Sequence, residues 1–565
     1  MNNKGFTMVE VLGVVTILVI ISLFTFPIIS SLTNDTTSKN KQFLDSLYQA
    51  TETYLEMNYE RFKNNEISYI SASKLIEEGL LSNSLINPNT NKRVIDEDGV
   101  VEATRDVDNS FKYNYAINQY ITINYIEDLI GILDSGDTYE GKTIVLNRNL
   151  DFKKDESYKD INTSYKESTL KLYLNTSGVT QKSSVFMGNI SGNGYSIDNI
   201  YMTGNSLGLF NLIKTSTIEN INLSGIIDGN TGGLLATTIS DTFINNINVD
   251  IKVPYNSNIS NAYIGGIALD TTNVSISNSS VTTDINLSNT SNIGGFIGIA
   301  SITKIENCKQ SGSISGGNVA GIIREMSNHT KIINSSSQGK IRGNDVGGLV
   351  ILSDTSEIKN SFSTATLIGE KIGGLASSII QETKISNSYY AGNIDAINST
   401  GGLVRNASES TVESSYVVAN IECSSCLLLG GLIGEGTNLT IKNSYNLSNI
   451  NYGNSTGTIG GLISSINNSS IINTYSSGSI TGTNINTIVG GLIGSSTSST
   501  ITSSYSNSDL YNGNLIGNSA STDIINNSNN LTNEEMLKES SYNGWDFTNI
   551  WNIQNNGLPT LRKGS

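Results

Sequence analysis

The sequence predicts a mainly β protein in which a long N-terminal α-helix and a small α+β part precede a parallel β-solenoid of about 11–12 coils. Three observations predict it. An apolar run covers 11–29, a glycine-pair motif recurs at intervals of 25 to 33 residues between Gly208 and Gly491, and the repeats lack helical periodicity. With 565 residues, the chain is too long for one ordinary core.

Composition and charge limit the classes of function. Charged residues make up 15% of the chain, the formal net charge is −16, and His329 is the single histidine. An acidic chain is a poor candidate for nucleic-acid binding. With one histidine, it also lacks the usual residues for a metal centre or for histidine-based catalysis. We therefore expect no nucleic-acid partner and no cofactor.

Three cysteines are too few for a disulfide framework. Cys423 and Cys426 in the CSSC sequence could form a redox pair, or half a zinc site completed by Cys308 and His329. No thioredoxin-like βαβ pattern surrounds them. We expect incidental small residues or one exposed disulfide, and the sequence leaves open whether the bond forms.

The apolar run over 11–29 is long enough to span a bilayer as a helix. Lys4 precedes the run, which predicts that the N-terminus stays in the cytoplasm. No small-residue cleavage pattern follows the run, so an ordinary secretory signal is not indicated. Glu10 lies at the head of the run, and a carboxylate in such a place normally marks a function.

The sequence KGFTMVEVL at 4–12 resembles the N-terminus of type IV prepilins and pseudopilins. The resemblance implies a leader at 1–5, cleavage by a prepilin peptidase between Gly5 and Phe6, and methylation of the new amine of Phe6. It also implies that Glu10 faces the amine of a neighbouring subunit during filament assembly and that Pro27 bends the helix. A buried charge is tolerated when it is paired, which agrees with this role. The alternative is a plain membrane anchor with Glu10 at the interface.

After the apolar run, hydrophobic residues near helical spacing extend the predicted helix over 6–61. Residues 62–118 are expected to form a small pilin-like globular part. It should contain a short helix over Ser73–Glu78 and a hairpin over 94–103 whose turn is Asp98-Gly99.

An acidic stretch lies over 96–108. Some pseudopilins bind calcium in this part of the chain, but the spacing does not match an EF-hand loop. We expect a solvated acidic hairpin and leave calcium open. The acids are Asp96, Glu97, Asp98, Glu102, Asp106 and Asp108.

The repeats combine three short segments. A glycine, usually the second of a pair, is followed by apolar residues, as in GGLV and GGLI; ten or eleven residues later comes I-x-N-S or a relative, and GSISG at 312–316 exemplifies the third segment. An aromatic residue often follows the second segment: Phe362, Tyr389, Tyr416, Tyr445, Tyr475 and Tyr505. Such strands form a core only when stacked. The recurrent asparagine suggests an amide ladder, and the glycine pair suggests unusual dihedral angles or close backbone approach.

The repeat units resemble the GLUG-motif repeats of bacterial surface proteins and adhesins, with an entry segment over 119–190, the solenoid over 191–530 and a closing segment over 531–565. Residues 253–263 are expected to form a protruding loop, because the glycine interval is long there. An open solenoid end is an unpaired strand edge. We therefore expect the closing segment to cap the far end with Trp545, Phe547, Trp551 and Leu558.

Enzymatic activity is not expected. Arg324 and Arg405 occupy the same coil position but lie three coils apart, and no patch joins two acids with a base. Four glutamates near the I-x-N strand are interpreted as solvated side chains: Glu306, Glu357, Glu382 and Glu413.

The resemblances imply a minor subunit of a type IV pilus that carries an adhesin-like solenoid. The tip of the pilus would give such a subunit steric room. Its partners would be the prepilin peptidase, other pilin subunits through the N-terminal helix, the membrane before assembly, and an unidentified glycan or protein receptor. It would move from the cytoplasmic membrane to an extracellular pilus at the bacterial surface. The alternatives are a pseudopilin of a secretion or DNA-uptake system, or a membrane-tethered surface protein. No ligand-binding residue is assigned.

Overall fold

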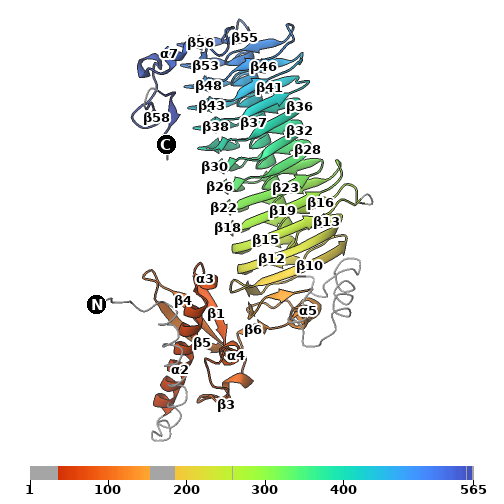
Figure 1. Cartoon of the computed structure of the whole chain (residues 1–565), viewed down its shortest axis with the longest axis vertical. Helices are drawn as coiled ribbons and strands as arrows, with labels where there is room; N and C mark the ends of the chain where they lie inside the picture. The colour runs from red at the N-terminus through yellow and green to blue at the C-terminus, as the bar shows by residue number, and fades with distance from the viewer. Residues whose placement is uncertain (1–35, 153–184, 257–258, 555–556, 563–565) are drawn as a thin grey trace, which may run out of the picture. The chain divides into compact units, whose positions relative to one another are not determined.

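The computed structural model describes residues 36–152, 185–256, 259–554 and 557–562 (Figure 1). The chain forms two compact units. Unit one consists of residues 1–168, 182–199 and 215–222, and unit two of 169–181, 200–214 and 223–565. The predicted leader, Gly5, Phe6, Glu10, Pro27 and the apolar run over 11–29 lie outside the described residues. Among the helices that the structure describes, none is long and apolar enough to cross a membrane.

The long helix predicted over 6–61 is not supported: residues 6–35 lie outside the described residues, and the described part of that range is not one continuous helix. Helix α2 (Thr36–Met57) is followed after Asn58 by the short α3 (Tyr59–Phe62). One face of α2, including Phe43, Leu47 and Tyr54, is buried in the core of this part. The other side of that core is a three-stranded antiparallel sheet in the order β1 (Ile67–Ser71), β4 (Gly99–Arg105) and β5 (Phe111–Ile117).

The predicted short helix is confirmed. Helix α4 (Ala72–Glu77) begins after Ser71, whose hydroxyl accepts a hydrogen bond from the backbone N–H of Lys74. This is a side-chain cap of the kind that starts a helix. Gly79 ends the segment with φ +73°. Strands β2 (Ile86–Asn87) and β3 (Lys92–Arg93) then pair with each other, and a 3-10 turn follows over Val94–Asp96.

The predicted hairpin over 94–103 is wrong. Strand β4 begins at Gly99 and pairs with β5, so the turn of the observed hairpin lies at 106–110, where Asp106 N–H donates to the carbonyl of Ser110. Gly99 lies inside the strand for another reason. A Cβ atom on Gly99 would lie 2.0 Å from the hydroxyl of Tyr115. The glycine therefore permits a close approach and does not form the turn.

The acids of 96–108 point to different partners. Asp96 pairs with Arg93, Asp106 pairs with Lys112, and Glu102 accepts a hydrogen bond from Tyr120. Among the described residues, no group of three or more histidine, cysteine or acidic side chains is placed to hold a metal ion. The calcium hypothesis therefore gains no support from this part of the chain.

The entry segment already stacks parallel strands. Strand β6 (Tyr120–Ile123) pairs with β7 (Thr143–Leu146), which pairs with β9 (Asn189–Ser191), and β8 (Leu150–Asp151) follows β7. Helix α5 (Ile126–Asp134) separates β6 from β7. These strands have no glycine-pair marker. The structure consequently has about 14 solenoid turns, where counting the glycine markers predicted 11–12.

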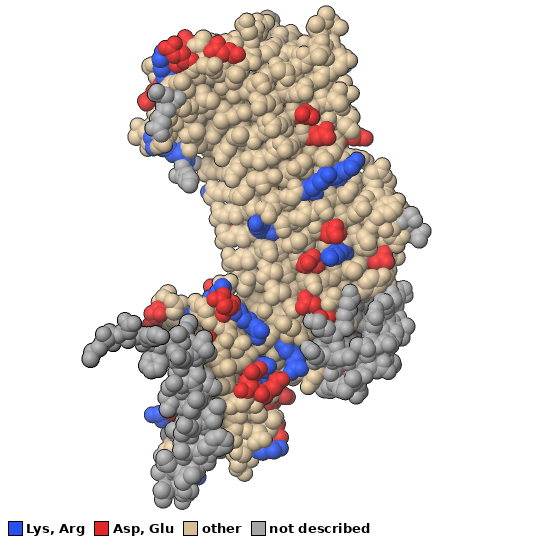
Figure 2. Space-filling model, in the orientation of Figure 1, with Lys and Arg blue, Asp and Glu red and all other residues tan. Residues whose placement is uncertain are grey.

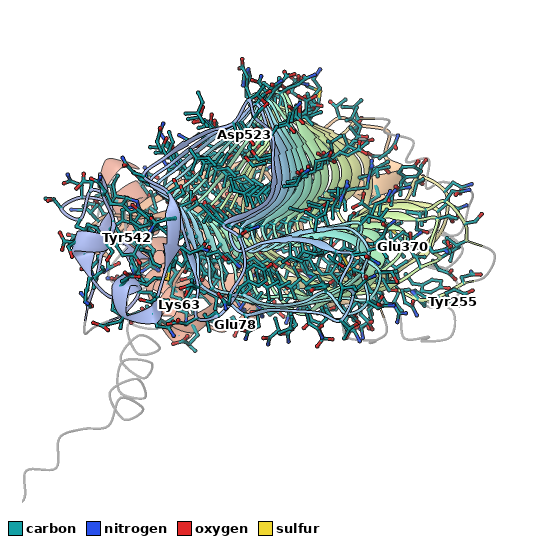
Figure 3. The ribbon with its side chains drawn as sticks, turned by 90° about the horizontal axis from the view of Figure 1, so that it is seen from above. Lys63, Glu78, Tyr255, Glu370, Asp523 and Tyr542 are labelled. Atoms are coloured by element: carbon teal, nitrogen blue, oxygen red, sulfur yellow. A yellow bond between two sulfur atoms is a disulfide. The ribbon has the colours of Figure 1, made fainter. Side chains whose placement is uncertain are left out.

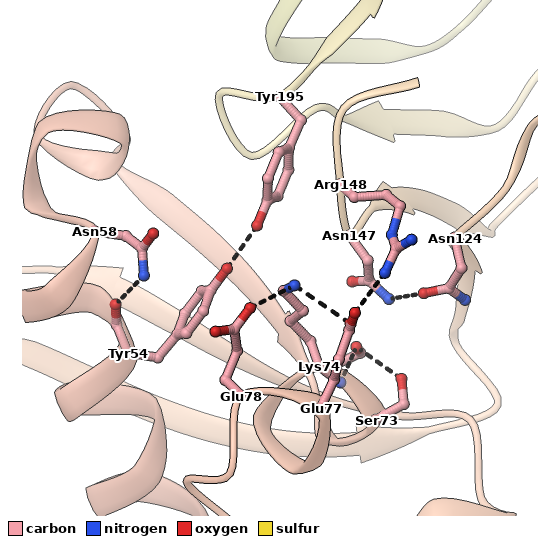
Figure 4. A network of polar contacts seen from close by, with 11 residues as sticks. Tyr54, Asn58, Ser73, Lys74, Glu77, Glu78, Asn124, Asn147, Arg148 and Tyr195 are labelled. Carbon is pink, nitrogen blue, oxygen red and sulfur yellow. Dashed lines mark hydrogen bonds and ion pairs between the residues drawn. The ribbon is translucent and has the colours of Figure 1, made fainter. Parts of the chain in front are cut away.

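Polar contacts join the α2–α4 region to later residues of unit one (Figure 4). The hydroxyls of Tyr54 and Tyr195 lie 2.5 Å apart, whereas Lys74 pairs with Glu78 inside the α4 region at 2.6 Å. Arg148 of the entry segment pairs with Glu77 at the end of α4. Elsewhere in unit one, the half-buried carboxyl of Glu219 has a pKa that is raised to about 7 by burial, with smaller contributions from Glu66 and Glu102.

Unit two confirms the parallel β-solenoid. A representative coil contains β30 (Glu357–Lys359), β31 (Phe362–Ser363), β32 (Thr366–Gly373) and β33 (Ala376–Ile380), and each strand pairs in parallel with its equivalent one coil later. The successive coils superimpose when viewed along the stack (Figure 3).

Two columns of strands in the stack correspond to the first two segments of the repeat. The strand after the glycine pair forms a separate 12-stranded sheet: β11 (Phe210–Lys214), β14 (Ala236–Ser240), β17 (Ala268–Thr272), β21 (Ile297–Ser301), β25 (Ile323–Ser327), β29 (Val350–Asp354), β33, β37 (Val404–Ser408), β42 (Ile433–Thr437), β47 (Ile463–Asn467), β52 (Ile493–Thr497) and β55 (Ile516–Ser519). The I-x-N segment forms the other column: β15 (Phe243–Val253), β18 (Ser275–Ser277), β22 (Lys304–Glu306), β26 (Lys331–Ile333), β30, β34 (Lys384–Ser386), β38 (Thr411–Glu413), β43 (Thr440–Lys442), β48 (Ser470–Ile472), β53 (Thr500–Thr502) and β56 (Ile524–Asn526).

The core consists of identical positions stacked in register. Ile305, Ile332, Ile358 and Ile385 pair in successive coils, and each is fully buried. Because side chains alternate between the two faces of a strand, the flanking residues of each I-x-N strand face outward. The arrangement explains why this position keeps a β-branched apolar residue, isoleucine or in one coil Val412, whereas its outward neighbours are mostly lysine, glutamate, serine and threonine.

The serine of I-x-N-S forms a buried hydrogen-bond column, here called the serine ladder: Cys308, Ser335, Ser361, Ser388, Ser415 and Ser444. The hydroxyl of Ser388 accepts from the backbone N–H of Ser361 in the preceding coil at 3.1 Å and donates to the carbonyl of Ser386 at 2.7 Å. Equivalent inter-coil bonds recur along the ladder. Buried backbone groups need such partners where the strand turns.

The asparagine before that serine adopts a left-handed conformation. Asn334, Asn360 and Asn387 have φ values of 49°, 51° and 49°, a region that asparagine enters more readily than most residues. Asn360 also donates to the side-chain oxygen of Asn334 at 3.1 Å. The predicted amide ladder is thus present in part, and the backbone turn is a second reason for the asparagine.

The glycine pair permits close approach. A Cβ on Gly373 would lie 1.7 Å from the carbonyl oxygen of Ala376, and one on Gly374 would lie 1.8 Å from that of Gly402 in the next coil. The predicted loop is also confirmed: β15 ends at Val253, β16 (Tyr263–Gly265) begins ten residues later, and Tyr255 between them is 63% exposed (Figure 3).

The serine ladder can be tested with Ser388→Ala. The substitution leaves the N–H of Ser361 buried without its acceptor, so the free energy of unfolding should fall by about 1–3 kcal/mol. Ser378→Ala, on an outward-facing position of β33, is the control and should change it by about 0.5 kcal/mol or less. Urea denaturation of the full-length protein measures both, and equal effects would contradict the role of the ladder.

Glu219→Gln tests the half-buried carboxyl. Because the folded protein holds this proton more tightly than the unfolded chain, stability is highest below the ordinary pKa of 4.5 and falls as the pH rises through about 7. The glutamine variant should lose that fall and gain up to about 3 kcal/mol at pH 8. Thermal unfolding between pH 5 and 8 measures it, with the exposed Glu52→Gln as the control. An unchanged pH profile in Glu219→Gln would contradict the assignment.

Candidate functional site

The aromatic residues after the I-x-N strands form one column, the aromatic ladder. The parallel register pairs them in succession: Phe362, Tyr389, Tyr416, Tyr445, Tyr475 and Tyr505. The first five rings stack on one another, with centroids 4.8 to 5.1 Å apart and planes within 10° of parallel. Strand spacing in a sheet therefore sets the ring spacing, and it lies within the range that favours aromatic pairs.

The C-terminal segment covers the later half of this ladder. Trp545 and Trp551 form one cluster with Tyr445, Tyr475 and Tyr505, which are at most 4% exposed. Helix α7 (Asn533–Met536) and strand β58 (Trp551–Asn552) lie beside the strands of the last coils (Figure 1), and Tyr542 lies at the side of the stack (Figure 3).

The prediction that this segment caps the far end is wrong. Trp545, Phe547, Trp551 and Leu558 pack on the lateral aromatic ladder. Rings offer more apolar area than the strand edge of the last coil, and burial of that area drives the packing. In the last coil, Ile524 and Ile525 of β56 are 54% and 46% exposed.

Two tryptophans in the segment differ in their polar contacts. Trp545 donates from Nε1 to the carbonyl of Ser503 at 2.9 Å. Trp551 is fully buried, and its Nε1 has no hydrogen-bond partner among the described residues. Tyr475 donates to the carbonyl of Pro559 at 2.6 Å, which fixes the end of the segment to the ladder. The cover is therefore held by specific contacts as well as by apolar burial.

The earlier half of the ladder lacks this cover. Phe362, Tyr389 and Tyr416 are half-buried, and only Tyr416 touches the edge of the C-terminal cluster. Val418, two residues after Tyr416, is 44% exposed. The uncovered part is thus a strip of ring edges with an apolar margin.

A face rich in lysine borders the uncovered rings. We define the lysine face as the outward residues of β22, β26, β30, β34, β38 and β43 together with Lys309, the first residue of β23 (Lys309–Ser315). It carries six lysines and three glutamates. The face is therefore positively charged in a chain whose net charge is −16. Charged side chains are otherwise sparse over the coils in the view of Figure 2.

Three of the glutamates that were interpreted as solvated belong to this face and form ion pairs. Glu306 pairs with Lys304 at 2.6 Å and Glu357 with Lys331 at 3.3 Å. Glu413 pairs with Lys384 and Lys442. Burial alone would raise the pKa of Glu413, but the two lysines hold it below its ordinary value. The side chains of these three are therefore ion-paired and only partly solvated. Glu382 lies exposed in a turn, with φ +61°.

The arginines lie where the repeat predicted. The register Ile323–Val350–Ala376–Val404 places Arg324 and Arg405 three coils apart. Arg324 pairs with Glu325 and lies over the ring of Tyr263 at 5.5 Å. Arg405 donates from Nε to the hydroxyl of Ser377 at 3.0 Å. The two arginines do not share a site.

The cysteines have structural positions. Cys423 and Cys426 form a disulfide that is buried, so the expectation of an exposed bond is wrong on that point. Cys308 occupies a serine-ladder position, where its thiol lies 3.3 Å from the carbonyl oxygen of Glu306. Burial raises the pKa of the Cys308 thiol to about 12. His329 is exposed in a turn. These residues do not converge on a zinc or redox centre.

Sequence reasoning found the aromatic ladder but missed the lysine face. Its signal was present: lysine or glutamate recurs at the first or third position of the I-x-N strands, as in Lys304, Lys331, Lys359, Lys384 and Lys442. Alternation along a strand implies that these positions face the same side. A single repeat contains one or two of these charges, so the charged face emerges only from the stacked repeats.

No family model and no curated protein matches the chain. Among solved structures, it is similar to a chain described as "IgA1 Protease", at 15% identity and a TM-score of 0.26. The similarity covers 67% of this chain and 24% of that one, so the chain spans about a quarter of that protein's length. At this TM-score, the likeness carries no argument about activity.

Paired substitutions test how the C-terminal segment is held. Trp545→Phe removes the hydrogen bond to the carbonyl of Ser503, whereas Trp551→Phe removes none among the described residues. Trp545→Phe should therefore lower the free energy of unfolding by about 1 kcal/mol more than Trp551→Phe does. Chemical denaturation measures the difference. A larger loss for Trp551→Phe would contradict the contacts described above.

Proposed function

We propose that this chain is a minor subunit of a type IV pilus and that its β-solenoid serves attachment to a surface or a host. The observation that carries the proposal is the KGFTMVEVL sequence at 4–12, in which Gly5, Phe6 and Glu10 occur at the spacing of a prepilin cleavage and assembly site. An apolar run long enough to span a bilayer follows directly.

The fold of unit one is compatible with this proposal. Helix α2 lies within the range 6–61 for which a helix is predicted, and it buries its apolar face on the antiparallel sheet β1–β4–β5. A helix with one buried face can extend from such a part and expose its other end to a second environment. The buried partner of Glu10 would be the amine of Phe6 in a neighbouring subunit, because a charge in an apolar filament core requires an opposite charge.

The side chains on the surface of the solenoid support the proposal of attachment. It presents a column of aromatic rings beside a lysine face, and both repeat with the coil spacing. Repeated side chains suit a partner that is itself extended or repetitive, since several weak contacts add up. A minor subunit, at the tip or elsewhere, has room for such a rod where a major subunit does not. No reaction is proposed.

A pseudopilin of a secretion or DNA-uptake system shares the same N-terminal features and is the second candidate. The net charge of −16 disfavours direct DNA binding. A surface protein tethered to the membrane is the third candidate, and it differs in keeping its N-terminus. Cellular location distinguishes the pilus subunit from the other two candidates. It would lie in the cytoplasmic membrane before assembly and in an extracellular filament afterwards.

The test is mass spectrometry of the N-terminus in sheared filaments and in membranes. We expect a chain that begins at a methylated Phe6 and is present in the filament fraction. Glu10→Gln should leave cleavage intact and strongly reduce the amount in filaments. Glu56→Gln, an exposed position of α2, is the control and should leave that amount unchanged. An intact Met1 confined to membranes would refute the pilus assignment.

A further inference from the structure

The aromatic ladder stops abruptly at Phe362. One face of this ring stacks on Tyr389, with centroids 4.8 Å apart and planes within 2° of parallel. In the preceding coil, the register partner of Phe362 is Ser336, in β27 (Ser336–Ser337). A serine side chain is too short to cover a phenyl ring. The second face of Phe362 therefore has no ring stacked against it among the described residues.

The position beside Ser336 has the height of one coil. Ring spacing along the ladder is 4.8 to 5.1 Å, so one further ring would fit between Phe362 and the next side chain in the column. The next side chain is Lys309, which pairs in register with Ser336. Two strand spacings, roughly 10 Å, separate the backbones of Lys309 and Phe362.

Polar groups at this position are available for binding. Ser336 is partly exposed, and its hydroxyl makes no hydrogen bond to any residue that the structure describes. Lys309 is exposed and makes no ion pair within the described part of the chain. The position thus combines an aromatic face, a hydroxyl and a cation.

Charge on the surroundings favours an anion. The lysine face, to which Lys309 belongs, carries six lysines against three glutamates, and all three glutamates are already paired with lysines. Lys359, on the strand that leads to Phe362, is likewise exposed and free of ion pairs within the described residues. A negatively charged partner would complement this face in an otherwise acidic chain.

We propose that the position beside Ser336 is a subsite for a carboxylated sugar ring, which stacks on the free face of Phe362 and places its carboxylate at Lys309. The C–H groups of a pyranose carry partial positive charge and match the negative face of an aromatic ring. The ring hydroxyls match the hydroxyl of Ser336. The inference rests on the proposed attachment function and names its ligand class.

The covered half of the ladder supports the choice of surface. The chain itself packs rings of its C-terminal segment against Tyr445, Tyr475 and Tyr505, with Trp545 and Trp551 tilted by 43° and 55° to the ring of Tyr475. The uncovered half of the ladder belongs to the same column and also presents aromatic rings. It differs from the covered half in charge, because Lys309 and Lys359 flank its earlier end. That charge selects an acidic sugar over a further apolar segment.

Ser336→Tyr provides a sharp test, because it fills the subsite with a ring of the protein's own. The added tyrosine extends the ladder by one position, so the unfolding midpoint should stay the same or rise. Binding should be lost. Ser313→Tyr adds the same side chain at an exposed position of β23 in another column and should leave binding unchanged.

The measurement is calorimetric titration of the full-length protein in detergent micelles with three probes: oligogalacturonate, sialyllactose and neutral maltohexaose. We expect one or both acidic sugars to bind and maltohexaose not to bind. The two acidic probes distinguish a uronic-acid polymer from a terminal sialic acid. Phe362→Ala should weaken binding about tenfold. Lys309→Gln should weaken it about threefold to fivefold and reduce its dependence on salt.

Four outcomes would overturn the subsite. These are no binding of either acidic sugar to the wild type, binding that survives Ser336→Tyr, equal binding of maltohexaose, and displacement of the sugar by benzoate, which would indicate an aromatic acid. The N-terminal experiment fails independently. A chain that binds the acidic sugar but starts at Met1 keeps the subsite and loses the pilus, and the reverse result keeps the pilus and loses the subsite.

Discussion

In-register parallel pairing of each coil with the next is the interaction on which unit two depends. Each strand of an inner coil pairs with its equivalent in both neighbouring coils, so its residues lie between the equivalent residues of those two coils. A substitution at one position therefore changes contacts with both neighbouring coils. Ile332, Ile358 and Ile385 show the apolar consequence, and the serine ladder shows the polar one. The coil tolerates variation where side chains face outward.

The same constraint creates the surface features. A tyrosine that recurs in successive coils becomes a stack of parallel rings, because the strand spacing lies close to an aromatic contact distance. Lysines that recur on the I-x-N strands form a positively charged face. Its charge is partly neutralised where Glu413 pairs with Lys384 and Lys442. A short repeat thus produces rows of equivalent side chains along the solenoid. The C-terminal segment packs on the later half of the aromatic ladder and is thereby fixed to the last coils.

The proposed pilus assignment implies a division of labour between the two ends of the chain. The N-terminal motif and apolar run would insert the chain into a membrane and then a filament, with Glu10 requiring a partner from another subunit. The coils display rows of rings and cations at the coil spacing. Such a surface suits recognition through many similar contacts, and the end of the open ladder at Phe362 is where a distinct ligand group fits best.

The sequence by itself determined the repeat, the solenoid class, the stacked isoleucines and the aromatic column, because parallel in-register stacking makes spacing along the chain equivalent to position in space. It also indicated helix α4 and the loop around Tyr255. Only the tertiary structure decided where the C-terminal segment packs, since Trp545 and Trp551 suit a strand edge and a row of rings equally well by composition. It likewise decided the pairing of β4 with β5, because Gly99 serves a turn or a close approach with the same sequence signal. The lysine face and the open side of Phe362 depend on neighbours one coil away, which the sequence of a single repeat does not contain.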